Sequence, residues 1–242
     1  MSFSLYIHIP YCQSKCPYCD FNSYAASVWP EADYTRAVMA EMAYRGANSP
    51  WAGRHVKTIF FGGGTPSLFQ AGSIGAMIEA ADRLFGVDSG AELTLEANPG
   101  TVTAANLVAF KAAGVNRISF GAQSFDSAIL KFLGRIHSAD DTREAVRLAH
   151  KAGFERLNLD LIFAVPGQQL RHVRNDIAQA VALEPDHISA YNLTFEEGTA
   201  FFNEMQRGRL RPLATDEQAG DGQPIRYEET PGSPPDCAFG PA

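Results

Sequence analysis

Six short apolar segments alternate with amphipathic segments along most of the chain, and this alternation is the strongest constraint on its fold. Strands are expected over residues 3–9, 56–61, 92–96, 116–121, 156–163 and 187–193. Helices are expected over residues 31–45, 71–85, 103–113, 126–133, 139–152, 169–183 and 200–208. Strands that alternate with helices form a parallel α/β sheet, and nearly continuous apolar strands are typical of sheets covered on both faces. The pattern fits a doubly wound open sheet or a partial barrel, and both place function at the carboxyl ends of the strands.

Composition excludes several classes of protein. The chain has 242 residues, of which 45% are hydrophobic, so there is enough apolar material for a large core. The net charge of −7 argues against a nucleic-acid-binding protein, which needs a basic face. The sequence shows neither a signal peptide nor an apolar run long enough to span a membrane, so we expect a cytoplasmic protein.

Three of the four cysteines lie within eight residues, at Cys12, Cys16 and Cys19, and the fourth is Cys237. Such clustering indicates metal or cluster ligation rather than a disulfide framework. A 4Fe–4S cluster on three thiolates would leave one iron open to another ligand. The alternative is structural zinc, for which His8 or Cys237 would have to supply the fourth ligand.

The segment around these cysteines resembles that of the radical S-adenosylmethionine (SAM) superfamily. The residues that carry the resemblance, from Tyr6 to Phe21, read YIHIPYCQSKCPYCDF. They are most similar to the branch that holds the anaerobic coproporphyrinogen III dehydrogenases and the HemW family of heme chaperones, over about residues 3–213. The resemblance implies a partial (β/α)6 barrel that binds a 4Fe–4S cluster through Cys12, Cys16 and Cys19, binds SAM, and is capable of cleaving SAM reductively.

Two further motifs close expected strands. Gly62–Pro66 reads GGGTP, which taken alone is as consistent with a tight turn as with a ligand site. Glu96 ends the third strand, where it is either a solvated loop acid or a functional carboxylate. The resemblance implies that Gly63, Gly64 and Thr65 contact the amino end of SAM and that Glu96 lies beside it.

The same resemblance implies that other polar residues belong to the SAM site. Gln123 follows the fourth strand and Arg135 comes twelve residues later, and both resemble family residues that contact SAM. Asp160 lies inside the apolar fifth strand, so it is either a buried ion-pair partner or, by resemblance, a residue on the adenosyl side of the pocket. The remaining expected SAM-site residues are Tyr6, Tyr18 and Thr194, whereas the other histidines are assigned to surface or structure.

The residues after Cys19 favour one branch. Dehydrogenases typically continue with Gly-Cys, whereas this chain has Asp20-Phe21 and only a short lead before Cys12. The resemblance therefore implies a heme chaperone that transfers heme to an acceptor protein, which can be membrane-associated, and takes electrons from a flavodoxin or ferredoxin. The alternative is an oxygen-independent coproporphyrinogen III dehydrogenase.

The chain departs from the family near its end. Thr215–Ala242 holds nine Gly and Pro residues in 28 positions, which is typical of a disordered segment. We therefore expect a core domain over residues 1–213 and a disordered tail over 214–242. The tail would stand where the family has its C-terminal domain, as the result of a truncation or a frame shift. Heme binding is then expected to need the part that is missing.

Overall fold

A computed structural model of the chain describes residues 2–48, 51 and 53–213. The expected tail over residues 214–242 lies outside the described residues. The sequence-based boundary near residue 213 therefore stays a prediction.

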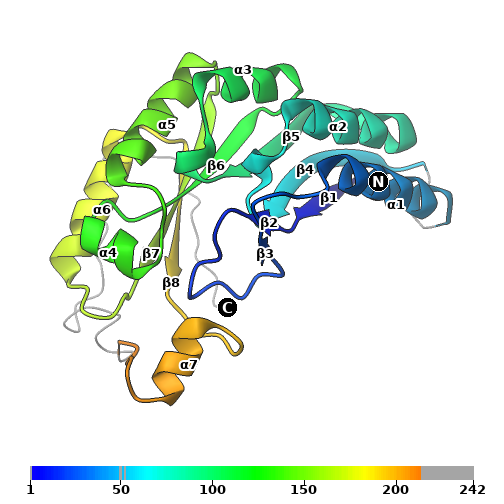
Figure 1. Cartoon of the computed structure of the whole chain (residues 1–242). Coiled ribbons are helices and arrows are strands. Elements are labelled where there is room, and N and C mark those ends of the chain that lie inside the picture. The colour runs from blue at the N-terminus through cyan, green and yellow to red at the C-terminus, as the bar shows by residue number, and fades with distance from the viewer. Residues whose placement is uncertain (1, 49–50, 52, 214–242) are drawn as a thin grey trace.

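One parallel sheet of six strands organises the described chain. Its strands are β1 (Ser2–Ile9), β4 (His55–Gly63), β5 (Val87–Ala97), β6 (Arg117–Gln123), β7 (Arg156–Phe163) and β8 (His187–Asn192). They lie side by side in the order of the sequence, so the doubly wound alternative is wrong. The sheet curves and the helices between its strands lie on its outer side, which confirms the partial barrel (Figure 1).

Each helix expected from the sequence is present. The helices are α1 (Glu31–Asn48), α2 (Ala71–Phe85), α3 (Ala104–Ala112), α4 (Ser127–Phe132), α5 (Ala139–Lys151), α6 (Leu170–Ala182) and α7 (Ala200–Gln206). Side-chain caps set several starts: Asp126 accepts two backbone N–H groups at the start of α4, and Ser138 forms a capping box with Asp141 at the start of α5. None of the described helices is both long and apolar enough to cross a bilayer.

The strands are mainly apolar on their outer face and largely polar on their inner face, which corrects the expectation of apolar strands on both faces. Leu95, Phe120 and Leu159 belong to the main core, between the sheet and the outer helices. The residues one position further along, such as Glu96 and Asp160, face the inside of the barrel. Alternate side chains of a strand point to opposite faces, so a polar inner face places a ligand site within the barrel.

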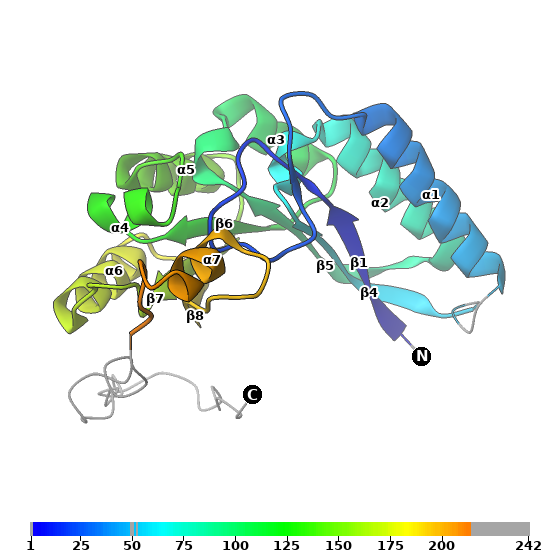
Figure 2. The ribbon, with the colours of Figure 1, turned by 60° about the horizontal axis from the view of Figure 1, so that its bottom comes forward.

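A second, smaller apolar cluster lies at the carboxyl end of the barrel. Its buried members are Ile129, Leu133, Ile162, Val165, Leu193 and Phe201. Tyr18 of the cysteine loop, which we define as residues 10–25, packs against this cluster. The Phe201 N–H also donates to the Pro17 carbonyl at 2.9 Å, so α7 holds the loop against the barrel end (Figure 2).

Short elements complete the fold and were not expected from the sequence. β2 (Tyr11–Cys12) and β3 (Tyr24–Ala25) pair at the two ends of the cysteine loop. The 3-10 helices Pro66–Leu68 and Pro99–Thr101 follow β4 and β5. Two- and three-residue elements carry too few side chains to show a period, which explains why the sequence does not reveal them.

Candidate functional site

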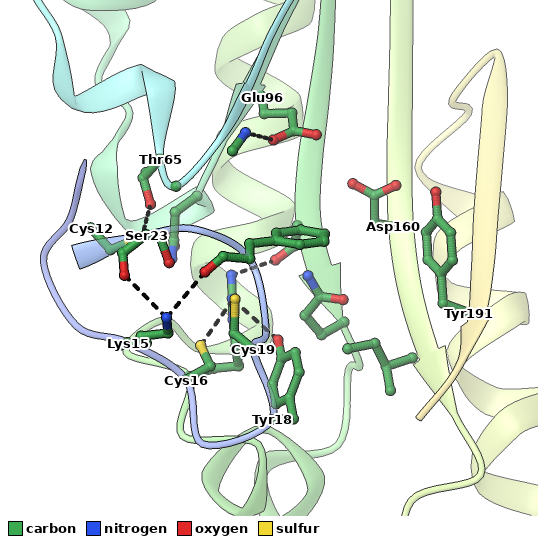
Figure 3. Close-up of a pocket in the computed structure, with 18 of the residues that line it drawn as sticks. Cys12, Lys15, Cys16, Tyr18, Cys19, Ser23, Thr65, Glu96, Asp160 and Tyr191 are labelled. Carbon is green, nitrogen blue, oxygen red and sulfur yellow. Dashed lines mark hydrogen bonds between the residues drawn. The ribbon is translucent and has the colours of Figure 1, made fainter. Parts of the chain in front are cut away.

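A cavity of about 470 Å³ opens at the carboxyl ends of the strands, within the size range of small-molecule sites. The cysteine loop forms one wall, and the inner faces of the strands form the other (Figure 3). The predicted site residues that line this cavity are Cys12, Cys16, Tyr18, Cys19, Gly63, Gly64, Thr65, Glu96, Gln123, Arg135, Asp160 and Thr194. The structure thus brings together residues from the cysteine loop and from five of the six strands or their ends.

Tyr6 is the predicted residue that does not line the cavity. Its side chain is 56% exposed, and its hydroxyl lies 3.1 Å from Nδ1 of His8. The other ring nitrogen of His8 lies 2.8 Å from the Asn22 carbonyl oxygen. Both nitrogens of His8 therefore have partners, which counts against His8 as a fourth zinc ligand. Cys237, the other candidate for that ligand, lies outside the described residues.

All three cysteines of the loop are free thiols that are partly buried. Thr65 donates a hydrogen bond to Cys12 Sγ at 3.5 Å, and the Lys15 ammonium donates to the carbonyls of Phe21 and Ser23, both at 3.1 Å. Burial raises the pKa of the Cys19 thiol above its ordinary value. Among the described residues, no three His, Cys, Asp or Glu side chains are placed to hold a single metal ion.

Gly63 and Gly64 bring the cysteine loop onto the edge of the sheet. The Gly64 N–H donates to the Ile9 carbonyl at 2.8 Å, and the Thr65 N–H donates to the Tyr11 carbonyl at 2.8 Å. A Cβ on Gly64 would lie 2.6 Å from the Tyr11 carbonyl oxygen, and Gly63 has a φ of 113°. Only glycine fits this close approach without a backbone shift, which explains the residue type at both positions.

Two buried carboxyl groups face the cavity from neighbouring parts of the sheet. Burial and the nearby Asp160 raise the pKa of Glu96 to about 7, although the Gly63 N–H donates to its Oε2 at 3.2 Å. Burial also raises the pKa of Asp160, against the hydrogen bonds that it accepts from Ser119 and Asn158. Burial disfavours the charged form of both carboxyl groups, and the charge of Asp160 adds to this effect at Glu96, so this wall of the cavity is suited to a cationic ligand.

Arg135 links the cysteine loop to the sheet. Its Nη1 lies 3.4 Å from Cys16 Sγ and 3.5 Å from the Tyr18 hydroxyl, and its Nη2 donates to the Gly121 carbonyl at 3.0 Å. Its Nε is buried and has no hydrogen-bond partner among the described residues. A buried donor without a partner is costly, so a ligand oxygen at this position would satisfy it.

Sequence reasoning missed a polar network behind Asp160. The Asn158 amide donates to Ser119 Oγ at 2.7 Å and to Asp160 Oδ1 at 2.8 Å, and Ser189 Oγ donates to Asn158 Oδ1 at 3.1 Å. His187 Nδ1 lies 2.6 Å from the same Asn158 oxygen. The period-two alternation of polar residues in β6 and β7 is the signal that could have revealed this network.

The 4Fe–4S cluster and SAM implied by the sequence fit the residues present. Three thiols from one loop line the cavity, and thiolates are the ligands that iron–sulfur clusters prefer. The cavity lining also includes Arg135, whose Nε has no partner among the described residues, and the carboxyls of Glu96 and Asp160. This donor and these acceptors complement a ligand that carries both a carboxylate and positive charge, as SAM does.

Comparison with known proteins agrees with this geometry. The sequence model of the radical SAM superfamily matches residues 6–180 of the chain. The chain is 43% identical to the heme chaperone HemW of Escherichia coli (strain K12) over 217 residues, which are 89% of this chain and 55% of that relative. It is 45% identical to HemW of Haemophilus influenzae over 201 residues, covering 82% of this chain and 52% of the relative.

A solved structure shares the fold. Coproporphyrinogen III oxidase (HemN) from Escherichia coli, described as a radical SAM enzyme, superposes with a TM-score of 0.77 at 25% identity, over 89% of this chain and 49% of that one. The chain thus spans about half the length of the relatives that it matches. On the family match, the barrel and the cysteine motif, the chain belongs to the radical SAM superfamily and is HemW-like within it.

Proposed function

We propose that this chain holds a 4Fe–4S cluster on Cys12, Cys16 and Cys19 and binds SAM next to it. The observation that carries the proposal is the arrangement of the cavity, with three thiols on one wall and Glu96 and Asp160 on the other. Three protein ligands would leave one iron of the cluster open, and SAM's amino and carboxylate groups would take that position. When bound, the reduced cluster would supply the electron that cleaves SAM.

The surrounding residues would bind SAM and keep it in one orientation. Glu96 would accept a hydrogen bond from an N–H of the SAM amino group, beside the backbone of Gly63. Arg135 would offer its free Nε to the SAM carboxylate. Asp160 would accept hydrogen bonds from the ribose, because Ser119 and Asn158 already fix its two oxygens in place. Tyr18, Gln123 and Thr194 would close the pocket around the ligand.

The raised pKa of Glu96 predicts that SAM affinity depends on pH. A carboxyl group with a pKa of about 7 is mostly protonated at pH 6 and mostly ionised at pH 8. Only the ionised form attracts the positive charge of SAM and accepts hydrogen bonds from its amino group at both oxygens, so the affinity of the cluster-loaded chain for SAM should rise about tenfold from pH 6 to pH 8. Calorimetric titration with SAM at several pH values measures this rise. Glu96→Gln should bind SAM more weakly and remove most of the pH dependence.

Glu92→Gln is the matched control for that variant. Glu92 lies on the same strand, but its carboxylate faces Arg117 and Arg156 at 3.8 Å and 3.7 Å. This control should keep the rise in affinity with pH. An equally steep pH dependence in Glu96→Gln would show that another group titrates.

For the activity of the whole protein, we propose a heme chaperone in which this chain supplies the cluster and SAM half. The relatives named HemW and the sequence Asp20-Phe21 after Cys19 support this proposal. Its partners would be a heme acceptor protein and an electron donor such as a flavodoxin or ferredoxin. The second candidate is an oxygen-independent coproporphyrinogen III dehydrogenase, supported by the structural likeness to HemN.

Two parallel assays on the anaerobically reconstituted chain separate these candidates. With SAM and a reductant present, we expect no oxidative decarboxylation of coproporphyrinogen III. Heme titration should show weaker binding than that of full-length HemW from Escherichia coli, because this chain matches only 55% of that relative. Formation of protoporphyrinogen would favour the dehydrogenase instead. Tight one-to-one heme binding would place the heme site within the barrel.

A further inference from the structure

A strained turn presents Gln123 to the cavity at the end of β6. Gln123 has a φ of 66°, in the region that favours glycine. The Ser124 N–H donates to the Ala122 carbonyl at 2.8 Å, two residues earlier, so Gln123 is the central residue of a γ-turn. The pairing of β6 with β7 also shifts register between Phe120 and Gln123. Irregularities of this kind re-aim side chains beside active sites.

Such a turn does not hold itself in place. A γ-turn with a positive φ at a residue other than glycine is strained and persists only where its surroundings fix it. The Gln123 side-chain amide lies over Gly121, with its Nε2 2.8 Å from the position that a Cβ on Gly121 would take, and Arg135 Nη2 lies 3.3 Å from the same position. The turn therefore places Gln123 next to Arg135.

One anchor of the turn is His137. Its Nε2 lies 3.1 Å from the Ala122 carbonyl oxygen, the same oxygen that closes the γ-turn. The side chain is only 4% exposed. Burial, aided by the charge of Arg135, lowers the pKa of His137 to about 4, so the ring is neutral near pH 7. A neutral ring with its proton on Nε2 donates to Ala122, which fixes the residue before Gln123.

The other anchor is Asp176 of α6, which is 3% exposed. Its Oδ2 accepts a hydrogen bond from Ser124 Oγ at 2.7 Å, and its Oδ1 accepts one from the Phe125 N–H at 2.7 Å. Ser124 Oγ in turn accepts from the Asp126 N–H at 3.0 Å. One buried carboxyl group thus fixes the two residues that follow Gln123. Burying it is costly, and this cost is offset only where its hydrogen bonds are made.

We propose that Asp176, together with His137, is a positioning residue that holds Gln123 in its strained turn so that it can contact SAM. The inference rests on the proposed function, since it assigns a purpose to residues behind the proposed SAM site. Neither residue lines the cavity, so each acts through the backbone between Gly121 and Phe125. Without the anchors, the turn relaxes and Gln123 leaves the position that it holds beside Arg135.

The test is to compare Asp176→Ala with Asn116→Ala in the cluster-loaded chain. Asn116 also makes two side-chain hydrogen bonds, to the Leu93 N–H and the Ala91 carbonyl, but at the opposite end of the barrel. Once the strain is released, only a fraction of the molecules should hold Gln123 in the conformation that binds SAM. Asp176→Ala should therefore bind SAM about 5- to 100-fold more weakly. Iron content should equal that of the parent, and hydrogen–deuterium exchange of residues 121–126 should be faster without SAM. Asn116→Ala should keep the SAM affinity of the parent.

Two milder variants keep the test decisive if Asp176→Ala does not fold. Asp176→Asn keeps an oxygen for the Phe125 N–H and should recover part of the affinity. Ser124→Ala removes only the hydroxyl and should weaken SAM binding several-fold. Equal SAM affinity in Ser124→Ala, Asn116→Ala and the parent would overturn the positioning role. If the parent chain itself bound no SAM, the proposed function would fail first, and this inference with it.

Discussion

Replacement of Cys12, Cys16 or Cys19 by Ser is expected to abolish cluster assembly outright. The three thiols come from one loop and line one cavity wall, and no other cysteine lies among the described residues. A serine hydroxyl is a poor substitute for a thiolate as an iron ligand, and two remaining thiolates leave the cluster under-coordinated. After anaerobic reconstitution, each variant should lose the visible charge-transfer absorption and the bound iron and sulfide of the parent chain.

Cys237→Ser is the control for these three variants. The three-ligand proposal expects it to assemble the same amount of cluster as the parent. Loss of the cluster in Cys237→Ser would show that the fourth cysteine is a ligand. Stoichiometric zinc in place of iron and sulfide would favour the zinc alternative.

Gly64→Ala is expected to destabilise the folded structure at the site strongly. The added Cβ would lie 2.6 Å from the Tyr11 carbonyl oxygen, 2.8 Å from the Tyr11 nitrogen and 2.9 Å from the Pro10 carbonyl carbon. All three are backbone atoms, so the cysteine loop itself must move away from β4. Forced overpacking of this kind typically costs about 1–3 kcal/mol and occasionally more, and we expect about 3 kcal/mol here. Chemical denaturation measures the loss, and reconstitution should yield less cluster.

Gly72→Ala adds the same methyl group in open space. No atom lies within 4 Å of its Cβ position, and the residue lies in the first turn of α2. Alanine is the better helix former, so this control should be stabilised by up to about 1 kcal/mol. Equal stability of the two variants would mean that the loop yields freely at Gly64, and that its docking on β4 is weak.

Periodicity in the sequence predicted the barrel because its strands and helices are long enough to repeat. α2 and β7 have the predicted bounds. The prediction of apolar faces on both sides failed, because strands such as β7 read LNLDLIF. Single polar residues between apolar ones look like interruptions in a buried strand. In three dimensions they form the inner face of the barrel.

The site was predicted only in part, because a short sequence motif identifies the residues that belong to it and no others. Residues that line the cavity and belong to a short motif, such as Cys16 and Gly64, could be identified from the sequence alone. His137 and Asp176 act on a turn that they reach only through the tertiary fold, and nothing local distinguishes them from core residues. Tyr6 belongs to the motif, but its side chain turns toward His8 instead of the cavity. A resemblance identifies positions, whereas the direction of a side chain follows from packing.

The carboxyl groups of the cavity wall favour a cationic ligand. The charge of Asp160 disfavours ionisation of Glu96, and a cationic ligand relieves this effect. An anionic ligand without an ammonium or sulfonium group would gain nothing from this wall. We therefore expect SAM to bind more tightly than S-adenosylhomocysteine, which lacks the sulfonium charge.

Electron paramagnetic resonance of the reduced, reconstituted chain tests the central claim most directly, since it reports on the ligands of the cluster. We expect a 4Fe–4S signal that changes its shape when SAM is added, because SAM would take the iron position that Cys12, Cys16 and Cys19 leave open. A signal that stays the same at saturating SAM would show that the cluster has no open position for this ligand, and the proposed SAM site would then be wrong.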